Sequence, residues 1–368
     1  MIKRIAFFTV GFAFNRLVRM KFYEKIFPKN VEIYLFTTNK YLGKEKENYQ
    51  QRYEKDLKRT KVIYADYNPL KLSFTLRKLC KKHQIDRVMT LGHNLGGFFL
   101  LFATLLLKTD FCMNVLAAEF NRYKITGSIK ESALLLADNI YLFVLMQFAK
   151  KGMFTDALDA KRAPTFFLRE KNSMNHLPAP VNTDLFKIKN KVKCRKKLKL
   201  PLNKKIIIFV GRIVFTKGSN YLKELIKKHK DIHFIVIGRM IDKDFLNMKC
   251  KNFQWIEKKT SKELIDYYNA ADLSFCVNRE GGGIGLTSEE ALACGAPIIV
   301  SKLFRLKKSP ALYQVSLNFE EIDKAVIDFF KLSKDERKKV SKISRNYAKE
   351  TYSDKVLKNK YITAYLIK

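Results

Sequence analysis

The 368 residues are enough for two domains, and a hydrophobic content of 47% gives each a core, which excludes a disordered chain. The formal net charge is +37 and both halves are basic, which excludes a neutral body with one basic tail. Such a charge attracts polyanions, namely nucleic acid, anionic lipid headgroups or phosphorylated substrates. A general lysine bias in composition is the alternative interpretation.

Cysteine usage and apolar stretches indicate a cytoplasmic protein without a membrane span. The six cysteines are spread along the chain and form no C-x-x-C pair, so we expect reduced, mostly packed thiols. The opening residues MIKRIAFFTV lack a cleavage site and are typical of a first buried strand rather than a signal peptide. The most apolar stretch, residues 97–107, is too short to cross a bilayer.

The first half of the chain predicts strands that alternate with helices. Strand candidates are the apolar runs at residues 5–10, 31–37, 61–64 and 86–91. Residues 72–83 have the spacing of an amphipathic helix, and residues 97–107 form an apolar one. This alternation favours a parallel sheet covered by helices on both faces.

Residues 188–205 are the best candidate for a domain boundary. Nine of these eighteen residues are Lys or Arg and none is acidic, so we expect an unpacked surface connection. Strands are expected again at 206–210, 233–238, 273–277 and 298–301, with helices at 219–229, 261–271 and 287–294. The predicted division is an N-terminal domain at 1–187, the connection at 188–205, a C-terminal domain at 206–350 and a helix at 351–368 that packs back on the N-terminal domain.

A basic loop follows the first strand of the second half. Gly211 and Arg212 stand at the strand end, with Lys217 and Gly218 shortly after them. Doubly wound sheets bind ligands at such strand ends, and two cations over one crevice can neutralise a diphosphate. A Walker-type P-loop is excluded, because Thr216 stands where it needs glycine and Gly218 where it needs Ser or Thr. A solvated basic turn is the alternative.

A run of glycines precedes a predicted helix in the segment EGGGIGLTSEEALACGAP. Glycines let the backbone approach an anion closely, and the free N–H groups of a helix N-terminus can hold phosphate oxygens. Thr287 and Glu290 also fit a capping box, and Gly295 with Pro297 fits a helix stop. Glu290 therefore has two interpretations, as the carboxylate of a helix cap or as the acceptor of hydrogen bonds from ribose hydroxyls.

The order of these motifs resembles a known family. GRIVFTKG, then ELIDYYNAADLSF, then GGGIGLTSEEALACGAPIIVS resembles the donor domain of the family 4 retaining glycosyltransferases. LPAPVNTDLF looks like the family's hinge segment, and DRVMTLGHN and the helix–strand segment ESALLLADNIYLFV are more weakly similar to its acceptor domain. The resemblance implies the GT-B fold, an α/β architecture of two Rossmann-like doubly wound domains that face each other across a cleft.

The resemblance also implies roles for the matching residues, with a UDP- or GDP-sugar as donor substrate and no cofactor. The donor-binding positions are Gly11, Arg212, Lys217, Ile284, Gly285, Leu286, Thr287 and Glu290. Arg212 and Lys217 would bind the diphosphate, which Gly11 would approach from the N-terminal domain. The backbone at 284–286, with Thr287, would contact phosphate and sugar, Glu290 would bind the ribose, and the base would lie against residues 255–258.

Two departures from the family pattern concern catalytic positions. The family has two glutamates separated by seven residues, and counting back from Glu290 the partner position is Gly282. We expect Glu280 to take the sugar-contacting role through a shift in the loop, the alternative being that this contact is missing. In the family a histidine often follows the strand that corresponds to MNVLAAEF, and this chain has none there. Glu119, within that segment, is a weak candidate to replace the histidine. His93 matches a different family histidine, with a hydrogen-bonded loop residue as its alternative interpretation.

The chemistry implied is glycosyl transfer with retention, in which cations and the helix N-terminus stabilise the departing diphosphate without a metal. Asp242-Lys243-Asp244 has the letters of a metal-binding D-x-D pair, but its polar neighbours favour a solvated loop. The basic surface, the apolar helix at 97–107 and the basic helix at 72–83 suggest peripheral docking on an anionic membrane surface. A lipid-linked or cell-envelope glycan acceptor would suit that location.

Three competing functions differ from this interpretation. A nucleic-acid-binding protein would explain the net charge, but no recognised nucleic-acid motif is present and we expect no specific nucleic-acid partner. A GT-B epimerase or phosphorylase is a second alternative. The third is a protein that binds a sugar nucleotide without turning it over, suggested by Gly282.

Overall fold

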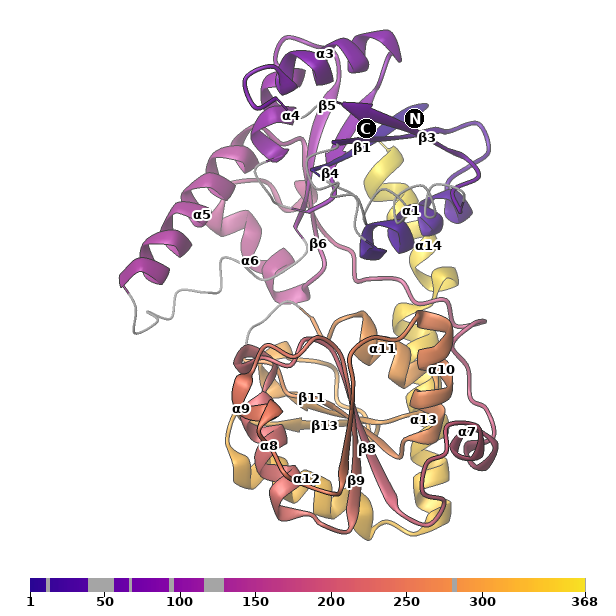
Figure 1. The fold of residues 1–368 in the computed structure, drawn as a ribbon. Helices are drawn as coiled ribbons and strands as arrows, with labels where there is room; N and C mark the ends of the chain where they lie inside the picture. Colours follow the sequence, from indigo (N-terminus) through magenta and orange to yellow (C-terminus); the bar gives the residue numbers. More distant parts are fainter. Residues whose placement is uncertain are drawn as a thin grey trace. The chain divides into compact units, whose positions relative to one another are not determined.

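The chain divides into two compact units in the computed structural model, which describes residues 1–10, 14–38, 56–65, 68–92, 96–115, 129–279 and 283–367 (Figure 1). The first unit comprises Met1–Pro178 together with Leu357–Lys368, and the second comprises Ala179–Val356. The boundary in this region therefore falls at residue 178 rather than at residue 187.

The described strands of the first unit form one sheet in the order β3-β2-β1-β4-β5-β6-β7, and every neighbouring pair is parallel. The bounds of these strands are β1 Arg4–Thr9, β2 Glu32–Thr38, β3 Thr60–Ala65, β4 Arg87–Thr90, β5 Asp110–Val115, β6 Lys151–Phe154 and β7 Met174–His176. The strand order reverses direction between β1 and β4, so the sheet is doubly wound.

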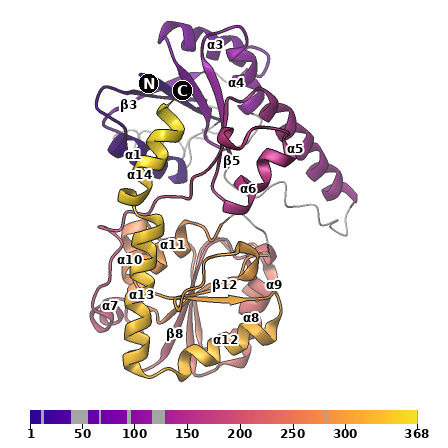
Figure 2. The ribbon, with the colours of Figure 1, turned by 180° about the vertical axis from the view of Figure 1, so that it is seen from behind.

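Each face of this sheet has its own layer of helices, because successive strand residues point to opposite sides. Ala6 and Phe8 of β1 pack into one core and Ile5 and Phe7 into the other. The helices on the first side are α3 Leu72–Lys82, α4 Gly96–Thr104, α5 Ile129–Phe148 and α6 Ala157–Phe166. Those on the second side are α1 Phe14–Ile26 and α14 Asp354–Leu366, and Figure 2 shows the two layers from behind.

Helix α5 corrects one expectation from the sequence. The segment ESALLLADNIYLFV is helical along its whole length and contains no strand, and the next strand is β6. Leu142, Leu145 and Met146 are buried at the spacing of one helix face. That periodicity outweighs the strand preference of the β-branched residues Ile140 and Val144.

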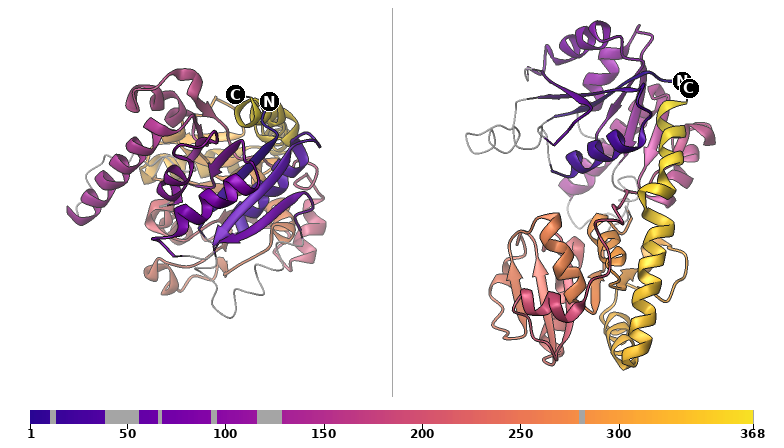
Figure 3. Two further views of the ribbon diagram at one scale, coloured as in Figure 1. Left: turned by 90° about the horizontal axis from the view of Figure 1, so that it is seen from above. Right: turned by 90° about the vertical axis from the view of Figure 1, so that its right-hand side faces the viewer.

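Helix α14 is held in the first unit by buried aromatic and charged groups. The rings of Tyr361 and Tyr365 stack with centroids 5.5 Å apart, and both lie against Tyr23 of α1. Figure 3 shows α14 in yellow beside the dark α1. Arg87 of β4, which is fully buried, donates to the carbonyl oxygen of Tyr365 at 2.8 Å and pairs with Asp110 at 2.8 Å. The arginine thus binds the C-terminal end of α14, where helix carbonyls lack partners.

The second unit repeats the doubly wound design with a sheet in the order β10-β9-β8-β11-β12-β13, in which every neighbouring pair is parallel. The strand bounds are β8 Lys205–Val210, β9 Ile232–Ile237, β10 Phe253–Ile256, β11 Leu273–Cys276, β12 Ile298–Ser301 and β13 Leu312–Val315. On one side lie α7 Lys191–Lys197, α10 Ser261–Ala270, α11 Leu286–Ala293 and α13 Lys334–Tyr352. On the other side lie α8 Ser219–Lys228, α9 Lys243–Leu246 and α12 Phe319–Lys331 (Figures 1 and 2).

The basic segment 188–205 is packed, contrary to the expectation of an unpacked connection. It contains α7, which lies against α10 with Cys194 and Arg195 buried. Arg195 donates to the carbonyl oxygen of Ala270 at 2.9 Å and pairs with Asp272 at 2.8 Å. A lysine- and arginine-rich run can be packed here because its acidic partners come from α10 and the residues that follow it.

Candidate functional site

The carboxyl ends of β8 and β11 mark the point where the strand order of the second sheet reverses. In doubly wound sheets, ligands bind in the crevice outside the carboxyl ends of the two strands at this point. The basic loop, residues 211–218, follows β8, and the residues leading to α11 follow β11. The two motifs singled out in the sequence therefore share one edge of one sheet.

Hydrogen bonds join these two loops. The Thr287 hydroxyl at the start of α11 donates to the carbonyl oxygen of Val210 at 3.0 Å. The amide N of Arg279 donates to the carbonyl oxygen of Thr216 at 2.9 Å. The first bond ties α11 to the end of β8, and the second ties the loop after β11 to the residue before Lys217, so the two loops form one connected surface.

A glycine conformation fixes the end of the basic loop. Gly218 has φ 76°, in the left-handed region, and a Cβ at this position would lie 2.4 Å from the carbonyl oxygen of Val277. Glycine alone tolerates this approach to the end of β11. Lys217 directly precedes it, at the end of the 3-10 turn Phe215–Lys217. Burial raises the pKa of the Cys276 thiol at the end of β11, and a hydrogen bond with Ser288 and the charge of Lys217 oppose that rise.

Arg212 and Lys217 are available for an anionic ligand. Arg212 is exposed and Lys217 is half-buried, and neither side chain forms an ion pair or hydrogen bond with another described residue. Lys223 on the next helix differs, since it pairs with Asp242 at 3.4 Å and with Asp244 at 3.3 Å. Two cations that have no partner within the described ranges lie beside one strand edge and provide the charge that a diphosphate requires.

The N-terminus of α11 is open, and the predicted capping box is absent. Gly285 is the N-cap residue, with φ 80°, and offers no side chain to cap the helix. Thr287 bonds to Val210 instead of capping, because the helix begins one residue earlier, at Leu286. The amides of Leu286 and Thr287 have no partner among the described residues and can donate to an anion. Gly295 ends the helix with φ 82°, as the sequence predicts.

Glu290 lies on the buried side of α11, with 4% of its surface exposed. The Tyr268 hydroxyl of α10 donates to Glu290 Oε2 at 3.1 Å, and Oε1 has no partner among the described residues. Burial raises the pKa of Glu290 to about 8, although the Tyr268 hydrogen bond opposes the rise. The carboxyl group is therefore mostly protonated at neutral pH, and ribose binding by it stays a prediction.

A pocket of about 330 Å³ opens at the carboxyl ends of β8, β9 and β10. The residues that line it are Val210, Gly211, Ile237, Gly238, Arg239, Glu257, Lys258, Lys259 and Leu264. A Cβ at Gly238 would lie 1.9 Å from the carbonyl oxygen of Gly211, so glycine is required where the loops after β8 and β9 touch. The pocket adjoins the basic loop and includes two residues of the expected base-contacting segment, Glu257 and Lys258.

Arg279 is a site residue that the sequence analysis missed. Its guanidinium carbon lies 4.1 Å from the ring centroid of Phe215 and 4.7 Å from that of Tyr221, so the group contacts two aromatic rings. Its Nε atom is buried and has no partner among the described residues. The only sequence signal was its place two residues before the first glycine of the run, which gives no indication of the aromatic contacts.

Several predicted positions lie outside the described residues. They are Gly11, His93, Glu119, Glu280 and Gly282. Their roles stay predictions, as does the choice between Glu280 and a missing contact.

The D-x-D letters at 242–244 have a structural role. Asp242 is the N-cap of α9 and accepts hydrogen bonds from the Asp244 amide and the Ser219 hydroxyl. Within the described ranges, no group of three or more His, Cys, Asp or Glu side chains is arranged to hold a metal ion.

Two doubly wound parallel sheets in one chain define a Rossmann-like α/β protein. Residues 190–347 match the family described as "Glycosyl transferases group 1", and that segment includes the basic loop, α11 and the pocket. The matched segment lies within the second unit and covers less than half of the chain.

A curated relative and two solved structures extend the comparison. D-inositol 3-phosphate glycosyltransferase from Segniliparus rotundus is 24% identical over 161 residues, which cover 40% of this chain and 35% of the relative, about a third of its length. A glycosyltransferase from Rickettsia africae has a TM-score of 0.76 at 18% identity, over 99% of this chain and 98% of that one. Anabaena HepE in complex with UDP-glucose has a TM-score of 0.74 at 12% identity, over 97% of both chains. The expected fold of two Rossmann-like domains is confirmed.

Proposed function

We propose that the protein is a glycosyltransferase that moves a sugar from a nucleoside-diphosphate sugar to an acceptor, with retention of configuration and without a metal. The observation that carries the proposal is the connected surface at the switch point of the second sheet. There Arg212, Lys217 and the open N-terminus of α11 come from two loops that hydrogen bonds hold together. The family match over residues 190–347 supports the same function.

The donor would bind across this edge. Its diphosphate would lie against the two cations and the amides of Leu286 and Thr287, which stabilise the charge that develops as the nucleoside diphosphate leaves. These groups supply the positive charge that a divalent cation provides in other transferases, which supports metal-independent chemistry. The base would occupy the 330 Å³ pocket, and the unbonded Oε1 atom of Glu290 would interact with a ribose hydroxyl.

The bound UDP-glucose of Anabaena HepE supports a UDP-sugar as the first donor to test, with GDP-sugars next. For the acceptor, we propose a lipid-linked or cell-envelope glycan and a protein that works peripherally on the cytoplasmic face of an anionic membrane. The net charge of +37 supports such a location.

Titration calorimetry with UDP-, GDP- and ADP-sugars is the direct test of donor binding. We expect micromolar to millimolar affinity for one nucleotide class, unchanged by EDTA. Incubation with the bound donor, followed by NMR of the released or transferred sugar, then reports turnover and the configuration of the product. Absence of binding to every nucleotide sugar would overturn the proposal.

A sugar-nucleotide-binding protein without turnover is the second candidate, favoured by Gly282 in place of the glutamate expected from the family pattern. Donor binding without hydrolysis or transfer in the same experiment would support it. Restoring the carboxylate with Gly282→Glu should then raise donor hydrolysis if the missing side chain is the cause.

A further inference from the structure

Helix α5 exposes a row of apolar side chains. Leu136, Ile140, Val144 and Phe148 recur at every fourth position, and 58% of Leu136 and 57% of both Ile140 and Phe148 are open to solvent. Residues at this spacing lie on one face of a helix. A single exposed apolar residue is ordinary, but a row along one helix is a patch of the kind that marks interaction sites.

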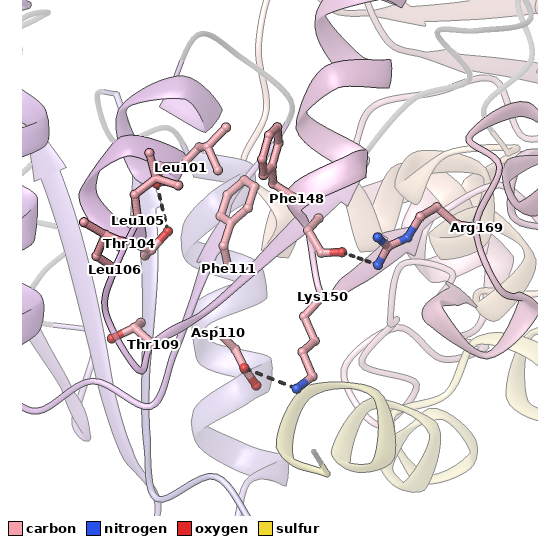
Figure 4. Close-up of a pocket in the computed structure, with 11 residues that line it drawn as sticks. Leu101, Thr104, Leu105, Leu106, Thr109, Asp110, Phe111, Phe148, Lys150 and Arg169 are labelled. Carbon is pink, nitrogen blue, oxygen red and sulfur yellow. Dashed lines mark hydrogen bonds and ion pairs between the residues drawn. The ribbon is translucent and has the colours of Figure 1, made fainter.

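The row continues onto α4 and the turn that follows it. The ring of Phe98 contacts that of the exposed Phe102 on one side and that of Tyr141 on α5 on the other, with centroids 6.4 and 4.7 Å apart. Leu105 and Leu106 are exposed and line a pocket of about 400 Å³ together with Phe148 (Figure 4). We call the combined surface the apolar face, and it consists of Phe102, Leu105, Leu106, Leu136, Ile140, Val144 and Phe148.

Cationic residues adjoin the apolar face. Figure 4 shows Lys150 and Arg169 across the same pocket from Leu105 and Leu106. Arg169 donates to the carbonyl oxygens of Gln147 and Ala149, so it is fixed at the C-terminal end of α5. Lys108 and Lys171 are exposed in the segments next to Leu106 and Arg169. Apolar side chains bordered by cations are the combination that binds an anionic lipid surface.

We infer that the apolar face docks on an anionic lipid bilayer, with α5 lying in the plane of the membrane interface. The inference deepens the membrane-associated part of the proposed function and rests on it. Lys150 pairs with Asp110 at 3.6 Å, so the exposed Lys108 and Lys171 carry the charge argument. They favour an anionic lipid surface over a second copy of the chain, since self-association through this face would bring these lysines of two copies together. None of the helices in the described ranges is both long and apolar enough to span a membrane, so the contact would be peripheral.

The structure adds α5 to the segments that the sequence suggested for this contact, the apolar helix at 97–107 and the basic helix at 72–83. Leu100, Leu101 and Ala103 of α4 are buried in the core of the first unit, whereas Phe102, Leu105 and Leu106 are exposed. Only one side of α4 remains for docking. The exposed row on α5 runs from Leu136 to Phe148, about 18 Å along the helix axis, and is the longer one.

Co-sedimentation with vesicles tests the inference on the full chain. We expect binding to phosphatidylglycerol–phosphatidylcholine vesicles that weakens with added salt, and little binding to phosphatidylcholine alone. The double variant Ile140→Glu, Phe148→Glu should weaken the partition coefficient at least tenfold. The matched control, Val192→Glu with Leu202→Glu, changes two exposed apolar residues of the second unit and should leave partition within twofold.

Two results would overturn the inference. One is wild-type protein that fails to bind the anionic vesicles, or a double variant that binds them as well as wild type does. The other is a wild-type dimer that the double variant dissociates while vesicle binding is unchanged, which would make the apolar face a self-association interface. Calorimetry with the nucleotide-sugar donor on the same samples separates the two proposals, since no residue of the apolar face is among the proposed donor-binding positions and donor binding should persist if only the docking inference fails.

Discussion

The segment around α7 and the loop 211–218 are both basic stretches of the second unit, yet their charges are used differently. Arg195 of α7 is buried against Asp272, and Lys189 and Lys197 each pair with Asp266. Arg212 and Lys217 have no such partner among the described residues. Charge in the sequence therefore does not distinguish a structural cation from a ligand-binding one, because the acidic partners come from a segment about 70 residues away.

The largest expected effect is a loss of stability from a substitution in the segment around α7. Arg195→Ala removes the ion pair with Asp272 and the three hydrogen bonds to the carbonyl oxygens of Ala270, Leu202 and Lys204. Lys191 still pairs with Asp272, so the loss comes from four hydrogen bonds of about 1 kcal/mol each, and we expect the free energy of unfolding to fall by about 3–5 kcal/mol. Thermal unfolding followed by circular dichroism would measure it. Lys193→Ala, which removes an exposed cation of the same helix, should change stability by less than about 0.5 kcal/mol. If the two variants lost the same free energy of unfolding, the buried Arg195 would contribute no more to stability than the exposed Lys193 does.

Substitutions of the two cations in the loop 211–218 should weaken donor binding and leave the stability of the protein unchanged. Arg212→Ala and Lys217→Ala each remove a charge-assisted contact to the donor diphosphate, so we expect about 1.5–3 kcal/mol of lost binding free energy, roughly 10- to 150-fold in Kd. Titration calorimetry gives the affinity, and the melting temperature should stay within about 1 °C because neither side chain has a partner in the part of the chain that the structure describes. Lys227→Ala, an exposed lysine of α8, is the control. Loss of stability without loss of donor affinity would reverse the assignment.

Glu290 adds a third case to the comparison of paired and unpaired charges, because burial rather than an ion pair determines its charge. Its folded-state pKa of about 8 lies above the ordinary value of 4.5, so the folded protein binds more protons than the unfolded chain between these pH values. Its contribution to stability therefore falls as pH rises through this window, by about 2 kcal/mol between pH 6 and 7.5. Glu290→Gln should lose this pH dependence in thermal unfolding. A variant with the same slope as wild type would mean that Glu290 is already ionised.

The smallest effect should come from Arg279. We expect Arg279→Ala to loosen the loop after β11 and to weaken donor binding by about 1 kcal/mol, roughly fivefold, as the aromatic contacts with Phe215 and Tyr221 are lost. Arg279→Lys keeps the charge but not the planar group, so it should resemble alanine if stacking matters and wild type if charge matters. Calorimetry on the pair separates these roles, and unchanged affinity in both would exclude Arg279 from the site.

Local patterns predicted most of the fold correctly. The apolar runs that became β1, β2, β8, β9, β11 and β12 are buried on both faces, so their signal did not depend on distant partners. The strand expected within 131–144 was wrong because β-branched residues occur on a helix whose buried face has clear periodicity. The packing of α7 could not be predicted, since it depends on ion pairs with a segment far along the chain.

Features of the candidate site that depend on the residues of one loop could be predicted from the sequence. Contacts between two loops could not. Gly218 and the open N-terminus of α11 follow from glycine placement. The hydrogen bond from Thr287 to Val210 and the aromatic contacts of Arg279 join segments 50 to 80 residues apart, and no local pattern specifies them. The predicted capping box is absent because α11 begins at Leu286, which places Thr287 inside the helix, where its hydroxyl donates to Val210 at the end of β8.

The buried contact between Arg87 and the end of α14 has a consequence for how the protein is made. The aromatic cluster around Tyr23 needs Tyr361 and Tyr365, which a ribosome adds only after the whole second unit has been synthesised. We therefore expect the first unit to finish folding last, because the part of its core that α14 completes stays unfilled until the second unit has been synthesised. Ribosome-bound chains should show a protease-resistant second unit before the first one becomes resistant.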